Sequence, residues 1–111
     1  MELAEMQKDG VLIVEPHGRI DSVGSIAFGE RLSEAVHSGS HHLLIDLQHI
    51  LYISSAGFRS LLIAHKLVHE VQGKLVLCGM SSEVRRLFDI GTFSDIFTIC
   101  ASRDEGITIA K

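Results

Sequence analysis

The chain has 111 residues, of which 46% are hydrophobic, and its formal net charge is −4. This length predicts a single domain over residues 1–111. Its core must be aliphatic, because only 5% of the residues are aromatic. Lysines and arginines are not clustered, so the usual electrostatic footprint of a nucleic-acid-binding protein is missing. No apolar run approaches the roughly 20 residues of a membrane span, and the polar N-terminal segment is not typical of a signal peptide. We therefore expect a cytoplasmic protein that neither binds nucleic acid nor inserts into a membrane.

The first part of the chain indicates a β-hairpin followed by a helix. Residues 2–7 and 11–17 predict two short strands, since they flank Asp9-Gly10, a residue pair typical of tight hairpin turns. Within residues 18–39, apolar residues recur at helical spacing up to Gly39, which favours a helix that ends there.

The middle of the chain predicts a buried strand and a long helix. Residues 43–47 form an apolar run without strict alternation, which favours a strand covered on both faces. Residues 51–54 indicate a turn or a short helical segment. A helix is predicted from Ser55 to Gln72, with three stripes along its surface. The stripe that faces the core is small and aliphatic and consists of Gly57, Leu61, Ala64, Val68 and Val71. The opposite stripe is mostly charged and consists of Arg59, Ile63, Lys66 and Glu70. The flank between them consists of Phe58, Leu62, His65 and His69.

The last part of the chain continues the alternation of strands and helices. Residues 74–78 predict a buried strand, residues 81–90 a short helix, and residues 97–99 a last strand. The tail after Ser102 fits either a helix or a strand. Strands that alternate with helices in this way predict an α/β sheet with β-α-β crossovers. The two cysteines, Cys78 and Cys100, lie in apolar runs, which favours buried reduced thiols over a disulfide.

Ser55 stands where the apolar run ends and the long helix begins, and two interpretations of it are open. It can be the N-cap of the helix, a position that favours serine. It can also be a site of modification, because a helix N-terminus exposes unpaired N–H groups and a partial positive charge that favour an anion. The small neighbours Ser54, Ala56 and Gly57 would leave its hydroxyl accessible. A phosphate there would add about −1.5 to −2 charges.

Catalytic and metal-binding interpretations have less support in the sequence. Ser55, Ala56 and Gly57 match the second half of the hydrolase motif G-x-S-x-G, but Ile53 occupies the first glycine position. His65 and His69 have a spacing that can hold a metal, but no acid or cysteine accompanies them on that flank. No glycine-rich phosphate-binding loop is present. We expect no catalytic residue, no metal and no cofactor.

Polar residues also follow two of the predicted strands. Asp21 and Ser22 precede the first helix, where they can provide turn and cap chemistry. Asp46 comes at the end of the apolar run and can be a turn acid. If the first helix begins near the carboxyl end of its strand, Asp21, Ser22 and Ser55 share one edge of the sheet. In open α/β sheets this edge is where ligands and partners usually bind.

Three segments together resemble the STAS domain family, the fold of anti-sigma factor antagonists and of the cytoplasmic tails of sulfate transporters. "GRID" (residues 18–21) resembles the family's Gly-x-Leu-Asp. "LLIDLQHILYISSAGFRSLL" (residues 43–62) resembles its signature strand and helix start. "GKLVLCGMSSEVRRLFDIGTF" (residues 73–93) resembles its next strand and helix. The resemblance covers nearly the whole chain and implies the STAS fold: α/β, with a four- to five-stranded mixed β-sheet and about four helices.

The resemblance also implies a function that is not enzymatic. In the family, an anti-sigma factor that is also a GHKL-type serine kinase phosphorylates the antagonist, and a PP2C-type phosphatase removes the phosphate. The unphosphorylated antagonist binds the kinase and frees the sigma factor. By position, the phosphoacceptor is Ser55. The implied partner surface comprises the loop after the second strand, the turn at the start of the second helix, and the flank of that helix. Its residues are Asp21, Ser22, Ser54, Ala56, Gly57, Phe58, Arg59 and Leu62.

The chain departs from the family pattern next to this serine. Ser54 stands where the family has an acid, and Ala56 where it has a second hydroxyl. Arg59 lies one helical turn after Ser55, where its guanidinium could pair with a phosphate or simply face solvent. Ser55 favours the phosphorylation-switched antagonist. Ser54 mildly favours the alternative, an unphosphorylated adapter subunit in an ABC lipid-transport system or a signalling scaffold.

Overall fold

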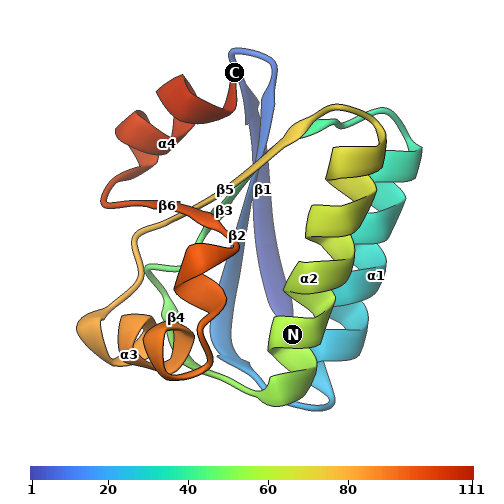
Figure 1. The fold of residues 1–111 in the computed structure, drawn as a ribbon. Helices are drawn as coiled ribbons and strands as arrows, with labels where there is room; N and C mark the ends of the chain where they lie inside the picture. The colour runs from blue at the N-terminus through green and yellow to red at the C-terminus, as the bar shows by residue number, and fades with distance from the viewer.

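The computed structural model describes residues 1–111, which form a six-stranded mixed sheet and four α-helices (Figure 1). This confirms the predicted α/β class. In chain order the elements are β1 (Glu2–Lys8), β2 (Val11–Ile20), α1 (Gly24–His37), β3 (His42–Asp46), β4 (Ile50–Ile53), α2 (Ser55–Glu70), β5 (Lys74–Cys78), α3 (Ser82–Ile90), a 3₁₀ turn (Phe93–Asp95), β6 (Thr98–Cys100) and α4 (Arg103–Ala110).

The first two strands form the predicted hairpin. β1 and β2 pair antiparallel from Glu2 opposite His17 to Lys8 opposite Val11. Asp9 and Gly10 both have positive φ angles, 54° and 79°. A two-residue turn with this backbone matches the twist of the flanking strands.

The remaining strands run parallel to β2, in the sheet order β1-β2-β3-β5-β6. α1 and α2 lie side by side on one face of this sheet, and α4 covers part of the other face (Figure 1). The central strand β3 is buried on both faces, as predicted, with Leu43, Leu44 and Ile45 fully enclosed. Alternate residues of β2, β3 and β5 therefore belong to two separate hydrophobic clusters, the larger one under α1 and α2 and the smaller one under α4.

β4 corrects the prediction of a turn or helical segment at residues 51–54. Residues 50–53 pair parallel with the end of β2, and a register shift between Gly18 and Arg19 skips Leu51 within this pairing. Ile50 and Ile53 are buried, whereas the two residues between them are exposed. The two buried residues are three positions apart, which is a helical spacing, so the pairing with β2 rather than the pattern determines this strand.

α2 buries most of its predicted aliphatic stripe, from Gly57 to Val68. The helix ends at Glu70 rather than Gln72, because Gln72 adopts a left-handed backbone with φ of 58°. Val71 is therefore outside the helix and exposed, contrary to the prediction. α2 is the longest helix, with 16 residues, and no helix combines the length and apolar character that crossing a bilayer requires.

The tail after Ser102 forms α4. The Ser102 hydroxyl caps the helix by accepting a hydrogen bond from the Glu105 amide at 3.2 Å. Gly106 lets the helix approach β3, since a Cβ at this position would lie 2.5 Å from a methyl group of Leu44. Glycine disfavours a helix interior, but here it is the residue that allows the helix to pack.

The two cysteines are free thiols that face each other across neighbouring strands, as register partners in β5 and β6. Cys78 is buried, as expected, whereas Cys100 is only half-buried. Burial raises the pKa of Cys78 to about 12, and burial also raises the pKa of Cys100.

Thiol labelling is therefore expected to distinguish the two cysteines. The thiolate is the reactive form, so an alkylating reagent at pH 8 should modify Cys100 slowly in the native protein and leave Cys78 unmodified. In urea both should react. Peptide mass spectrometry after timed quenching measures this, and fast labelling of Cys78 in the native protein would contradict the structure.

Candidate functional site

The carboxyl ends of β2 and β4 lie next to each other and carry most of the residues predicted to bind a partner. Ile20 and Ile53 are register partners at these two ends. The chain leaves β2 into Asp21 and leaves β4 into Ser54, and the Ser54 amide donates a hydrogen bond to the Ile20 carbonyl at 2.8 Å. The structure therefore brings the Asp21–Ser22 loop and the start of α2 together at one edge of the sheet.

Ser54, not Ser55, is the N-cap of α2. Its backbone is extended (φ −86°, ψ 171°) because it continues from β4. Its hydroxyl accepts a hydrogen bond from the Gly57 amide at 3.2 Å, and its carbonyl accepts one from the Phe58 amide. The prediction of Ser55 as N-cap was wrong by one residue, because two adjacent serines fit a cap equally well until the strand before them is placed.

Ser55 is consequently the first residue of α2. Its side chain is exposed and takes part in no hydrogen bond within the chain. The amides of Ser55 and Ala56 belong to the first turn and have no acceptor within the helix. The hydroxyl is thus free, at the end of the helix where an added anion is favoured.

Asp21 and Ser22 provide turn chemistry at the start of α1. The Asp21 side chain accepts a hydrogen bond from the Gly24 amide at 2.7 Å, and the Ser22 carbonyl accepts one from the Ser25 hydroxyl. Both residues are nevertheless exposed. They hold the loop in place beside Ser55 and remain accessible to a partner.

Phe58 does not lie on an exposed flank, which corrects the prediction. Only 7% of its surface is exposed, and its ring stacks on Phe93 at 4.4 Å and meets Phe88 edge-on at 4.8 Å. α3 and the 3₁₀ turn cover this side of α2, an arrangement that the period of α2 alone does not reveal. Leu62, on the same flank, is half-buried against the core.

Gly57 is also buried and cannot contact a partner through a side chain. Of the predicted surface on α2, only Ser55 and Arg59 are fully exposed, and Ala56 is partly so. Arg59 forms no ion pair in the structure.

The same edge carries exposed apolar side chains that sequence analysis missed. Val23 is 78% exposed, Ile26 62% and Leu51 73%, from the start of α1 and from β4. Sequence analysis placed Ile26 on the same helical face as Leu32 and Val36, and its exposure corrects that prediction. Where exposed apolar residues form a contiguous patch, they are typical of a surface that binds another protein.

Comparison with known proteins identifies the family of the chain. The family model of the STAS domain matches residues 4–106. The chain belongs to the STAS domain family. Over 111 residues, covering all of this chain and 96% of the relative, it is 36% identical to BtrV of Bordetella bronchiseptica, which is named a "Putative anti-sigma factor antagonist".

Solved structures share the STAS fold. A Thermotoga maritima protein matches with a TM-score of 0.92 at 16% identity, over 97% of this chain and 93% of that one. The anti-sigma factor antagonist SpoIIAA in its unphosphorylated form matches with a TM-score of 0.75 at 16% identity, over 96% of this chain and 94% of that one. Its Bacillus structure in the phosphorylated form matches with a TM-score of 0.75 at 15% identity, over 99% of this chain and all of that one.

Proposed function

We propose that this STAS domain is an anti-sigma factor antagonist whose binding to an anti-sigma factor kinase is switched by phosphorylation of Ser55. The observation that carries the proposal is the free, exposed hydroxyl of Ser55 at the first position of α2. The names of BtrV and SpoIIAA support the antagonist function, and the phosphorylated form of SpoIIAA supports the switch. The function implies a cytoplasmic location and no catalytic activity of the chain itself.

The exchange of the family's acid for Ser54 is compatible with this switch. Asp and Ser are both good N-caps, so either side chain can accept the hydrogen bond from the amide two or three residues on. Ser54 does so through Gly57. Because Ser54 fills the cap, Ser55 keeps its hydroxyl free for a kinase.

The phosphate would act on the surface without requiring the fold to change. A GHKL-type kinase would transfer the γ-phosphoryl group of ATP to the Ser55 oxygen, with ADP leaving and the hydroxyl proton passing to a base of the kinase. About −1.5 to −2 charges would then be added at the edge of the sheet that carries the exposed Val23, Ile26 and Leu51, and a partner that covers this edge would have to desolvate them. Arg59, one turn later, is available to pair with the phosphate. A PP2C-type phosphatase would restore binding by hydrolysing the ester.

Ser82 offers a matched control for Ser55. The pair Ser81-Ser82 repeats the arrangement at the start of α3, where the Ser81 hydroxyl accepts a hydrogen bond from the Val84 amide at 3.1 Å. Ser82 is therefore also an exposed first helical residue that follows a serine cap. The two serines differ in their surroundings rather than in local geometry.

We expect Ser55→Asp to weaken binding to the purified anti-sigma factor kinase by about tenfold or more. The partner would have to bury the added carboxylate, and the loss of its hydration would cost at least about 1.4 kcal/mol of binding free energy. Ser82→Asp should leave the affinity unchanged, and Ser55→Ala should bind constitutively. Calorimetric titration with each variant measures this, with circular dichroism as the check on folding. Equal affinities for wild type and Ser55→Asp would contradict the proposal.

Phosphopeptide mapping of the protein from its own host tests the modification itself. A single phosphate on Ser55, removable by phosphatase, is the expected result. Phosphate on Ser54 or Ser82 instead would contradict the assignment to Ser55. Absence of phosphate under all growth conditions, together with binding to a transporter ATPase or scaffold, would replace the switch with the adapter function.

A further inference from the structure

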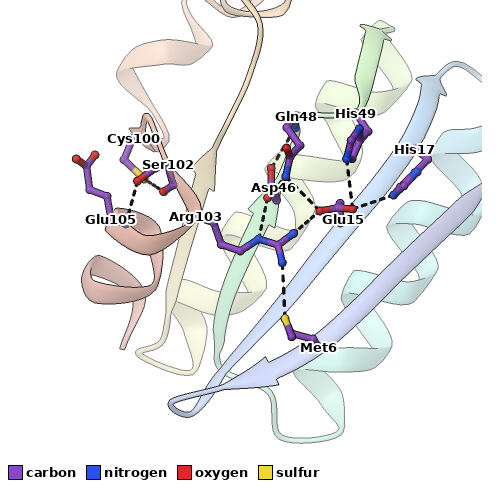
Figure 2. A network of polar contacts seen from close by, with 10 residues as sticks. All are labelled: Met6, Glu15, His17, Asp46, Gln48, His49, Cys100, Ser102, Arg103 and Glu105. Atoms are coloured by element: carbon purple, nitrogen blue, oxygen red, sulfur yellow. Dashed lines mark hydrogen bonds and ion pairs between the residues drawn. The ribbon is translucent and has the colours of Figure 1, made fainter.

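A second polar cluster lies on the sheet face that α4 covers in part (Figure 2). Glu15 and His17 occupy alternate positions of β2, so their side chains point to the same face as Val11 and Ile13, which pack under α4. His49 joins them from the loop between β3 and β4. We refer to Glu15, His17 and His49 as the Glu-His-His cluster.

The three side chains direct potential ligand atoms toward one another. The Nε2 atom of His17 lies 2.9 Å from the Oε1 atom of Glu15, and the Nε2 atom of His49 lies 3.7 Å from the same oxygen. All three ligand atoms lie within 4.8 Å of one another, and the two imidazole rings stack with their centroids 4.7 Å apart. The backbone holds this approach, since the Gly18 amide donates to the His49 carbonyl at 3.0 Å.

We propose that the Glu-His-His cluster binds a divalent transition-metal ion of the zinc class. Two imidazole nitrogens and one carboxylate oxygen are a ligand set that zinc uses at sites with an open fourth position. Bonds of about 2.0–2.1 Å in a tetrahedral site separate ligand atoms by about 3.4 Å. The observed separations of 2.9 and 3.7 Å lie on either side of this value. Water can complete the coordination, because the side chains of His17 and His49 are 35% and 50% exposed.

The carboxylate of Glu15 is already oriented for this role. Its side chain is only 15% exposed, and its Oε2 atom accepts a hydrogen bond from Arg103, which leaves Oε1 facing the imidazoles. Arg103 also donates to Asp46 at 2.9 Å, and the Gln48 amide group contacts both carboxylates. Hydrogen-bonded neighbours of this kind orient a ligand and raise metal affinity. Only the two histidines, of which His17 is partly and His49 more fully exposed, have to move.

The local charge favours a cation. With both histidines neutral, the carboxylates of Glu15 and Asp46 face the single guanidinium of Arg103, so the group carries a net negative charge. An ion at this point would tie β2 to the β3–β4 loop, on the face of the sheet opposite α1 and α2. The site is therefore on a different face of the sheet from the helix that begins at Ser55.

Calorimetric titration of the chelator-treated full chain with zinc chloride alone tests the proposal. One zinc per chain in the micromolar range is expected. His17→Ala and His49→Ala should each weaken binding by about tenfold or more. His69→Ala is the matched control, since His69 and His65 form the other close histidine pair, with ring centroids 4.8 Å apart on α2. Its affinity should equal that of wild type.

Cobalt substitution gives a second readout that does not depend on stability. Bound Co²⁺ should produce visible absorption bands that are lost in His17→Ala and His49→Ala but kept in His69→Ala. Either of two results would overturn the proposal: no zinc binding by the wild-type chain, or binding that His69→Ala removes and the two cluster variants retain.

Discussion

Gly57→Val is expected to lower the free energy of unfolding by about 3 kcal/mol or more, at the upper end of the range for overpacked cores. A Cβ atom at residue 57 would lie 2.7 Å from a side-chain carbon of Ile53 and 2.8 Å from one of Ile20. Carbon atoms normally approach to about 3.5–4.0 Å. Ile20 and Ile53 are buried and held in the paired ends of β2 and β4, so they have no room to retreat. Valine adds two further methyl groups to this conflict.

Urea unfolding followed by circular dichroism measures the loss, and a pair of alanine variants isolates its cause. Gly57→Ala and Gly29→Ala both replace a helical glycine and gain similar helix propensity, about 1 kcal/mol. A Cβ at Gly29 would lie 2.9 Å from the hydroxyl of Ser60 and would disturb its hydrogen bonds to the carbonyls of Ser25 and Ala56. A Cβ at Gly57 would lie closer to its neighbours, at 2.7 and 2.8 Å from two buried isoleucine side chains and 3.1 Å from the Ile20 carbonyl. Gly57→Ala should therefore be the less stable of the two. Equal stabilities would show that α2 can shift away from the sheet.

Gly57 thus acts in the candidate site by position rather than by contact. Its amide donates to the cap Ser54, and its missing side chain lets the start of α2 rest on the ends of β2 and β4. This close approach presents Ser55 at the edge of the sheet. The resemblance placed Gly57 among the partner-binding residues, and the structure assigns it the task of positioning that surface.

The elements that sequence analysis predicted well have local signals. Asp9-Gly10 specifies a hairpin through its backbone preferences, and the stripe from Gly57 to Val68 specifies the buried side of α2 through its period. β3 is recognisable because a strand covered on both faces contains no polar alternation. In each case, the pattern that predicts the element lies within one short segment of the chain.

The features that were missed depend on residues far away in the chain. β4 exists because it pairs with β2, and Ser54 caps α2 because β4 precedes it. His49 of the β3–β4 loop, a ligand of the proposed metal site, meets Glu15 and His17 only once β2 and that loop are aligned. The alternation of Glu15 and His17 was visible, but the third ligand was not. Ser55 as phosphoacceptor came from the family resemblance, since local physics leaves either serine as the cap.

Phe58→Ala provides the sharpest distinction between the surface predicted from sequence and the one observed. As an exposed partner contact, Phe58 could be truncated with little effect on stability. In the structure its ring lies between Phe88 and Phe93, so truncation leaves a cavity and removes two aromatic contacts. We expect a loss of about 3–5 kcal/mol in the free energy of unfolding, the range for a buried phenylalanine.

The adjacent Arg59→Ala is the matched control for this measurement. Arg59 is exposed and forms no ion pair, so its truncation should change stability by no more than about 0.5 kcal/mol. Urea unfolding of both variants without any partner gives the comparison, and Phe58→Leu should lose less than Phe58→Ala because it refills part of the cavity. A Phe58→Ala protein as stable as Arg59→Ala would return Phe58 to the binding surface and would mean that α3 does not pack over this side of α2. With the expected loss, the predicted partner surface would retain Asp21, Ser22, Ser55 and Arg59, next to the exposed apolar residues of α1 and β4.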